Sequence, residues 1–189
     1  MDTAKKNLEN IEVHFENVRP TRHRFDGESG LRDLLTSELK SLYCVEKTLL
    51  RAFPKLIKNS CSFDLIEALT IHQEETKLQV IRLEDVFAIL SEEPQIEKSA
   101  TIEVLLDRID LNIEDTKFGT VRDAGIILGM IQIEQFETAT YGTLATYAEN
   151  LKEMQIAQLL SDSINEEKVA QLRLAKIANT IRFYNTDFI

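Results

Sequence analysis

The stretch RDAGIILGMIQIEQFETATYGTLATYAE, residues 122–149, has the spacing of a single long amphipathic helix. At about 100° per residue, most of its apolar side chains fall on one face. Glu134 lies at the centre of that face, and Glu137 lies just inside it one turn later. A lone ionised carboxylate in an apolar core costs several kcal/mol or takes up a proton. The sequence therefore predicts a compensating group beside these two glutamates.

Three other segments repeat this arrangement. They are residues 31–58, 63–90 and 152–182. Each is predicted to be a long helix with one glutamate at the centre of its apolar face. These glutamates are Glu46, Glu75 and Glu167. A shorter helix is predicted over residues 101–115. The predicted fold class is therefore all-α: an up-down four-helix bundle with a short extra helix in the long crossover between helices 2 and 3.

The four central glutamates are also predicted to lie at one height in the bundle. Glu46 and Glu75 lie about 14 residues before and after the first predicted turn. Glu134 and Glu167 lie about 16 to 17 residues either side of the second predicted turn. Equal distances from the turn of an antiparallel hairpin mean equal height. We therefore expect the four carboxylates to meet near the middle of the bundle.

Four ionised carboxylates in a dry core repel one another, and protonating all of them at pH 7 needs a large pKa shift for each. Arg82 lies on the apolar face of its helix and could neutralise one of them. Two divalent cations would neutralise the whole set and satisfy its oxygens, as in dimetal-carboxylate bundles. The sequence therefore predicts a site for two divalent metal ions.

Several neighbouring side chains complete the candidate set. His72 precedes Glu75 by three residues and is either a ligand, a hydrogen-bond partner of a ligand, or a core histidine. Gln79 and Gln171 each follow a central glutamate by four residues; packing or hydrogen bonding is favoured for them over metal ligation. Tyr141, one turn beyond Glu137, is interpreted as a donor to the ligands or a core aromatic residue rather than a redox participant.

The composition sets broad limits on partners. The chain has 189 residues, 43% of them hydrophobic, and a formal net charge of −10. This charge argues against nucleic-acid binding and against an anionic membrane surface. We expect residues 29–182 to form one bundle domain, residues 1–28 a mobile or loosely docked N-terminal arm, and residues 183–189 a C-terminal tail.

The cellular location is predicted from what the sequence lacks. No apolar run approaches the roughly 18 residues of a membrane span, and the N-terminus has no apolar core of a signal peptide. Cys44 and Cys61 make no disulfide framework and are interpreted as reduced packing residues. We therefore expect a cytoplasmic protein.

Four strings within about residues 31–180 are distinctive: SELKSLYCVEKTLLRAFPKL, HQEETKLQVIRLEDVF, RDAGIILGMIQIEQFETATYGTLATYAE and INEEKVAQLRLAKIA. They resemble the YciE/YciF family of ferritin-like bacterial proteins. The patterns LY-x-x-EK-x-L, EET and E-x-x-E-x-A-x-YG-x-L are the specific part of the resemblance. It implies a ferritin-like four-helix fold, a non-haem dimetal centre, a homodimer, and ferroxidase-type or stress-linked activity. The matching positions are Glu46, Glu75, Glu134, Glu137 and Glu167.

The sequence departs from the usual ferritin-like pattern in its histidine. The forward Glu-x-x-His pair is absent, and His72 precedes its glutamate instead. A site with one imidazole and several carboxylates suits iron or manganese more than copper, with iron the first choice and manganese the second.

The function predicted from these features is a dimetal-carboxylate redox protein that reacts with O2 or peroxide. A manganese enzyme that disproportionates peroxide is a narrower alternative, and a storage cage is less favoured. An alternative of another class is a bundle that has lost catalysis and acts as a structural or partner-binding module. The scarcity of histidine and the presence of Arg82 motivate that alternative.

Overall fold

The computed structural model describes residues 27–95 and 98–181, and within these residues it contains five helices and no strands. The helices are α1 (Gly27–Asn59), α2 (Phe63–Leu90), α3 (Ala100–Asp115), α4 (Thr120–Asn150) and α5 (Met154–Thr180). The all-α prediction is confirmed, and α2 has the predicted bounds. The last two residues of the predicted arm belong to α1. The rest of that arm, with both of its histidines, and the predicted tail lie outside the described residues.

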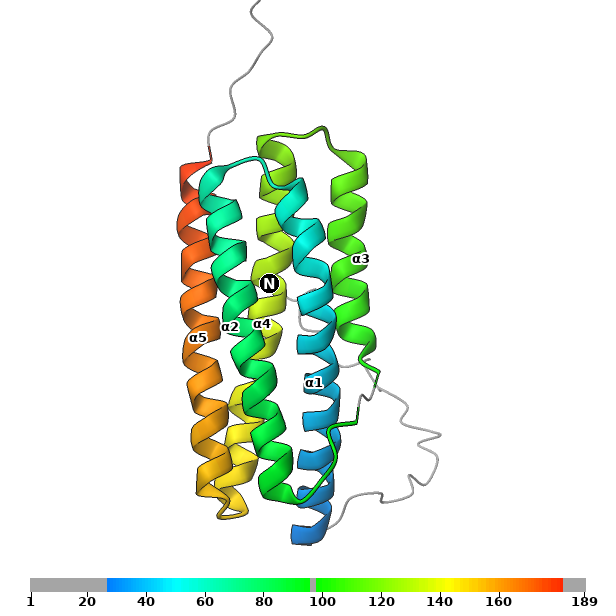
Figure 1. Cartoon of the computed structure of the whole chain (residues 1–189), viewed down its shortest axis with the longest axis vertical. Coiled ribbons are helices and arrows are strands. Elements are labelled where there is room, and N and C mark those ends of the chain that lie inside the picture. Colours follow the sequence, from blue (N-terminus) through cyan, green and yellow to red (C-terminus); the bar gives the residue numbers. More distant parts are fainter. Residues whose placement is uncertain (1–26, 96–97, 182–189) are drawn as a thin grey trace, which may run out of the picture.

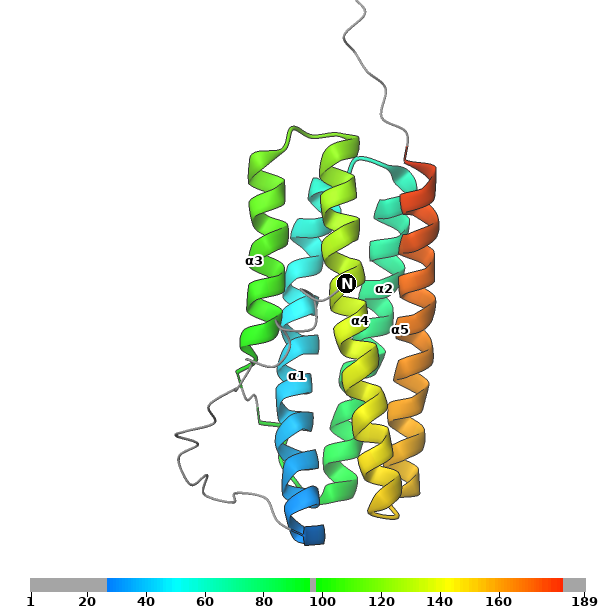
Figure 2. The same cartoon turned by 180° about the vertical axis from the view of Figure 1, so that it is seen from behind.

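Helices α1, α2, α4 and α5 form the four-helix bundle, and α3 packs outside it against α4 and α1 (Figures 1 and 2). The crossover that contains α3 carries the chain from the end of α2 back to the other end of the bundle. Helices α2 and α4 therefore point in the same direction, and each forms a tight hairpin with an antiparallel partner (Figure 1). This is the predicted bundle with an extra helix in the long crossover.

The two hairpin turns lie where the sequence predicts them. Ser62 begins α2, and its Oγ accepts a hydrogen bond from the backbone N–H of Leu65. The buried carboxylate of Asp123, at the start of α4, accepts hydrogen bonds from the backbone N–H groups of Cys61 and Ser62 at 2.7 and 2.8 Å. Asp123 therefore fixes the α1–α2 turn to the start of α4.

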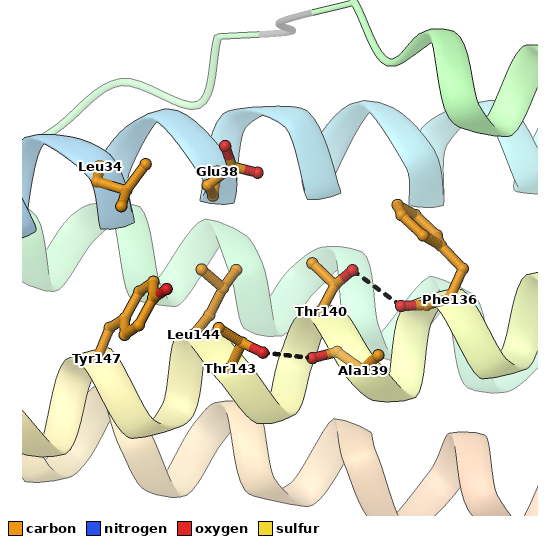
Figure 3. A pocket seen from close by; sticks show the side chains of 8 residues that line it. All are labelled: Leu34, Glu38, Phe136, Ala139, Thr140, Thr143, Leu144 and Tyr147. Carbon is orange, nitrogen blue, oxygen red and sulfur yellow. Dashed lines mark hydrogen bonds between the residues drawn. The ribbon is translucent and has the colours of Figure 1, made fainter. Parts of the chain in front are cut away.

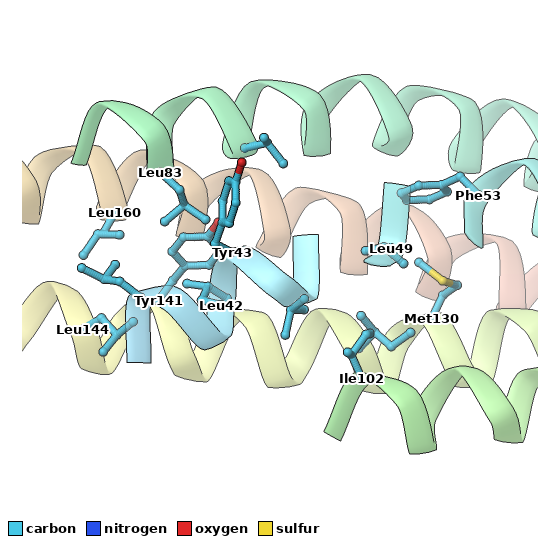
Figure 4. Close-up of a cluster of buried hydrophobic side chains, with 14 of the residues drawn as sticks. Leu42, Tyr43, Leu49, Phe53, Leu83, Ile102, Met130, Tyr141, Leu144 and Leu160 are labelled. Atoms are coloured by element: carbon cyan, nitrogen blue, oxygen red, sulfur yellow. The ribbon is translucent and has the colours of Figure 1, made fainter. Parts of the chain in front are cut away.

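The core is apolar above and below the middle of the bundle. Side chains from all five helices point into it, among them Leu42, Phe53, Ile102, Tyr141 and Leu160 (Figure 4). These side chains are almost fully buried, so they exclude water from the polar groups at mid-height. Cys44 is buried as predicted, whereas the prediction that Cys61 is a packing residue is wrong because it is exposed.

The α3–α4 contact depends on one glycine. A methyl group at Gly129 would overlap Cγ1 of Ile109 and lie 2.7 Å from its Cδ1. We therefore expect Gly129→Ala to destabilise the protein by about 1–3 kcal/mol, measured by urea unfolding. Gly142→Ala, also in α4, is the matched control because a methyl group there has nothing within 4 Å. It should be neutral or stabilise by up to about 1 kcal/mol. Equal effects of the two substitutions would contradict this packing argument.

Among the described residues, no helix has the length and apolar character needed to cross a membrane.

Candidate metal centre

Four acidic or imidazole side chains converge inside the bundle. They are His72 of α2, Glu134 and Glu137 of α4, and Glu167 of α5. Each offers a ligand atom, these atoms all lie within 4.8 Å of one another, and all four residues are buried. We call these four residues the carboxylate cluster.

The imidazole of His72 lies at one end of this cluster. Its Nε2 is 2.9 Å from Oε1 of Glu134 and 3.8 Å from Oε2 of Glu167. The ring of Phe53 packs against the imidazole edge-to-face, with the ring centroids 5.3 Å apart. Phe53 therefore restricts the orientation of an imidazole that faces two carboxylates.

Glu46 of α1 is fully buried beside the cluster and is held by a tyrosine. The hydroxyl of Tyr141 donates to Oε1 of Glu46 at 2.5 Å. On the opposite side, the buried amide of Gln79 donates to Oε1 of Glu167. Both Tyr141 and Gln79 thus contact a carboxylate, and each leaves the second oxygen of that carboxylate free.

Six buried carboxylate oxygens accept no hydrogen bond within residues 27–95 and 98–181, although Oε1 of Glu134 lies 2.9 Å from Nε2 of His72. They are Oε2 of Glu46, both oxygens of Glu134, both oxygens of Glu137, and Oε2 of Glu167. Buried polar atoms are almost always hydrogen-bonded, and leaving a charged one unpaired is strongly destabilising. Hard cations take such oxygens as ligands, so the side chains present fit a divalent metal ion.

Burial and the neighbouring charges shift the pKa values of these groups. Burial raises the pKa of Glu46 from 4.5 to about 7, although the Tyr141 hydrogen bond and His72 act in the other direction. Burial and the neighbouring carboxylates raise the pKa of Glu137 and Glu167 well above 4.5. Burial alone would lower the pKa of His72, but Glu134 outweighs it and raises that pKa to about 10.

Glu75, one of the predicted metal ligands, is not part of the carboxylate cluster. The prediction that it lies at the centre of the buried face of α2 is wrong, because its side chain is 21% exposed. The carboxylate accepts hydrogen bonds from Arg173 at 2.9 and 3.2 Å, and its Oε2 lies 3.4 Å from Nδ1 of His72. The centre of the α2 face is formed instead by His72, Thr76 and Gln79, so α2 is rotated relative to the predicted face.

Arg82, which the sequence analysis considers as a partner for one of the central glutamates, pairs with another residue. Arg82 does not pair with a core carboxylate; it donates to both oxygens of Glu166 at 2.7 and 2.9 Å and to Ser163 at 2.7 Å. Glu166 is half-buried. Gln171 is half-buried too and is not part of the cluster.

Two residues of this region carry no signal in the sequence pattern. Arg173 and Glu166 lie off the apolar stripe of α5, so helical periodicity does not single them out. Their pairing depends on which side of α5 faces α2. Neither residue is therefore predictable from the sequence pattern alone.

A surface pocket between α1 and α4 is separate from the cluster. It has a volume of about 350 Å³, and Figure 3 shows its lining side chains, with Glu38 as its only acidic one. The hydroxyls of Thr140 and Thr143 donate to backbone carbonyls of their own helix at 2.8 and 2.9 Å. This pocket does not offer the ligands of a metal site.

The family follows from a comparison of the sequence with known families. Residues 30–184 match the family described as "Domain of unknown function (DUF892)". The chain belongs to the DUF892 family. The match covers this DUF892 chain from the fourth residue of α1 to beyond the end of α5, with every residue of the carboxylate cluster.

Individual relatives agree with this assignment. The DUF892 chain is 34% identical to Protein YciF of Escherichia coli (strain K12) over 152 residues, 78% of this chain and 90% of that one. The crystal structure of the E. coli stress protein YciF superposes with a TM-score of 0.76 at 33% identity, over 79% of this chain and 94% of that one. YcfI of Rhodopseudomonas palustris gives a TM-score of 0.76 at 35% identity, over 81% and 95%. The resemblance to the YciE/YciF family and the ferritin-like bundle are therefore confirmed.

Proposed function

We propose that this chain is a dimetal-carboxylate redox protein. Glu46, Glu134, Glu137, Glu167 and His72 would hold two divalent metal ions, iron by preference and manganese as the second choice. The observation that carries this proposal is the set of six buried carboxylate oxygens that accept no hydrogen bond from the described residues and have a single imidazole, His72, beside them. Four carboxylates balance the charge of two divalent ions, and mainly oxygen ligands with one imidazole favour iron or manganese.

When bound in the reduced state, the metal ions would supply electrons to O2 or peroxide. The protein supplies position and exclusion of water. Tyr141 fixes one oxygen of Glu46, and Gln79 fixes one oxygen of Glu167, which leaves the other oxygen of each free for a metal ion. Phe53 holds the ring of His72, and the buried apolar side chains around the site keep bulk water out.

The direct test is metal loading without oxygen. Fe(II) added under argon should bind at about two ions per chain, as expected for a carboxylate-bridged pair. Exposure to O2 or peroxide should then produce a ferric absorbance in the near ultraviolet. Failure to take up metal would remove the proposal. Uptake with no reaction toward either oxidant would leave only a metal-binding bundle.

A manganese enzyme is distinguished from a ferroxidase by loading a second sample of the same protein with Mn(II). If the chain disproportionates peroxide, loading with Mn(II) should give oxygen evolution from peroxide that the Fe(II)-loaded protein does not match. Oxygen evolution by neither form would limit the proposal to a ferroxidase-type reaction.

A structural or partner-binding role is the second candidate. It is favoured by the single imidazole of the cluster and by the ion pair that holds Glu75 away from it. The relative from R. palustris is one for which a structural role has been suggested. This candidate predicts no metal uptake and no reaction with either oxidant, so the loading experiment separates the two.

The proposal includes a role in stress and a homodimer. The E. coli relative is named as a stress protein, and we propose the same context for this chain, without a nucleic-acid or membrane partner. Multi-angle light scattering should give the mass of two chains of 21.7 kDa. A cage of many subunits would point to storage instead.

A further inference from the structure

Two arginine–glutamate pairs join α2 to α5. Arg173 donates to both oxygens of Glu75 at 2.9 and 3.2 Å. Arg82 donates to both oxygens of Glu166 at 2.7 and 2.9 Å. All four side chains are half-buried, between 17% and 27% exposed. The two pairs thus have the same chemistry, the same two helices and similar exposure.

Only one of these pairs contacts the carboxylate cluster. Oε2 of Glu75 lies 3.4 Å from Nδ1 of His72, whose Nε2 lies 2.9 Å from Glu134. Arg82 instead adds a hydrogen bond to the buried hydroxyl of Ser163. A chain of contacts therefore leads from Arg173 through Glu75 and His72 to the cluster.

Arg173 is also reached from the surface. It lines a pocket of about 290 Å³ between α2 and α5, together with Asp64, Glu67 and Lys176. The guanidinium thus lies between this pocket and the half-buried carboxylate of Glu75. The charged side chains at this pocket besides Arg173 are therefore two acidic ones and one lysine.

Two positive groups could bind the Glu75 carboxylate: the guanidinium of Arg173 and a divalent ion in the cluster. Both of its oxygens are occupied by the guanidinium of Arg173. A divalent ion in the cluster would attract the same carboxylate inward, because Glu75 already contacts His72 and lies one turn from it on α2. A glutamate side chain has several rotatable bonds, so it can exchange partners without movement of the helix.

We propose that Glu75 has two positions and that Arg173 controls the change between them. Without metal, Arg173 holds Glu75 toward the α2–α5 pocket; with metal, Glu75 leaves Arg173 and becomes a further ligand. Arg173 is therefore a positioning residue that weakens metal binding. This inference rests on the proposed function, because it needs a metal ion in the cluster.

The test is a double-mutant cycle on the full chain with Mn(II) alone as the probe, in which the electron paramagnetic resonance of free Mn(II) gives the dissociation constant. Arg173→Gln should bind Mn(II) about three- to tenfold more tightly, because the metal no longer competes with a bidentate ion pair. Glu75→Gln should bind more weakly. In the Glu75→Gln background, Arg173→Gln should have no further effect.

The cycle separates partner exchange from simple charge repulsion. If Arg173 acted only as a nearby positive charge, its removal would tighten binding equally with and without Glu75. That result would overturn the inference, as would unchanged or weaker binding in Arg173→Gln. Arg82→Gln is the matched control, since it removes the other α2–α5 pair, and it should leave the affinity within twofold. An equal gain in Arg82→Gln would also overturn the inference.

Two further measurements test the same inference: the affinity of a charge-conserving variant and a crystal structure with Mn(II). Arg173→Lys keeps the charge but loses the bidentate geometry, so it should bind with an affinity between wild type and Arg173→Gln; circular dichroism checks that each variant is folded. A crystal structure of the Mn(II)-loaded wild type should show Glu75 turned away from Arg173. A Glu75–Arg173 pair retained beside a bound metal would overturn the inference and leave the proposed function standing. Absence of Mn(II) and Fe(II) binding in the wild type would remove the proposed function itself.

Discussion

Glu137→Gln is expected to weaken divalent-metal binding by about a hundredfold or more while it raises the Tm of the metal-free protein. Glu137 is fully buried, and neither of its oxygens has a hydrogen-bond partner in the described residues. Loss of a residue that hydrogen-bonds to a metal ligand lowers metal affinity about 10- to 100-fold. Loss of a ligating carboxylate should lower it at least as much. Without metal, burial and the neighbouring Glu46 and Glu134 disfavour the ionised form of Glu137 and outweigh the attraction of His72, so the pKa of Glu137 is raised well above 4.5.

The two effects have opposite signs, and this makes the prediction specific. Removing a buried charge that lacks a partner should stabilise the metal-free fold by about 1–3 kcal/mol, or roughly 2–4 °C in Tm for each kcal/mol. Isothermal titration with Mn(II) and differential scanning calorimetry in EDTA measure the two quantities. Glu74→Gln is the matched control on α2, because its side chain is 64% exposed and should change neither. A loss of stability in metal-free Glu137→Gln would show that this carboxylate has a structural role.

The metal-free protein is expected to lose stability as the pH rises from about 5 to about 9, and bound metal is expected to reverse this loss. Burial raises the pKa of Glu46 from 4.5 to about 7. Its contribution to stability is therefore full below pH 4.5 and is lost as the pH rises through 7. The pKa of His72 is raised from 6.5 to about 10 by Glu134, despite burial. Its contribution is full below pH 6.5 and is lost as the pH rises through 10.

Glu137 and Glu167 also make the metal-free protein less stable as the pH rises. The pKa values of Glu137 and Glu167 are raised well above 4.5, so the folded protein holds their protons more tightly than the unfolded chain does. The pKa of Glu75 is lowered to about 2: burial raises it, but His72 and Arg173 outweigh burial. Its opposite effect is confined to the range between about pH 2 and 4.5, below the range of this experiment.

Metal ions compete with these protons, so metal affinity and the stability that metal adds should both grow with pH. Tm should be measured between pH 5.5 and 8.5 with EDTA and with excess Mn(II). The EDTA curve should fall, and the gap between the two curves should widen. Glu137→Gln should have a flatter EDTA curve. A metal-free Tm that is constant or rises over this range would contradict the pKa shifts of the cluster.

The helices of this protein could be predicted from the sequence with little error. Apolar residues recur at helical spacing over long segments, and the turn near Ser62 and the crossover near Pro94 interrupt that spacing. The predicted starts and ends differ from the observed ones by a few residues at most. Helix ends are the least determined part of such a pattern, because the last turn has few contacts on either side.

The depth of three central glutamates was also predictable. Glu46, Glu134 and Glu167 are all fully buried; Glu134 and Glu167 converge in the carboxylate cluster, and Glu46 is close enough to interact with Glu134 and His72. Chain length and helical rise fix height along a helix, and neither depends on the neighbouring helices. The sequence alone therefore placed most of the carboxylates of the candidate site.

Only the tertiary structure decided how α2 is rotated about its axis. A one-residue shift turns a helix by about 100°, and the apolar pattern of α2 is too even to exclude it. Packing against α5 brings His72 and Gln79 inward and leaves Glu75 at the edge, where Arg173 binds it. Periodicity reports which side chains are apolar, but the partner of a charged side chain depends on which surface of the next helix it meets.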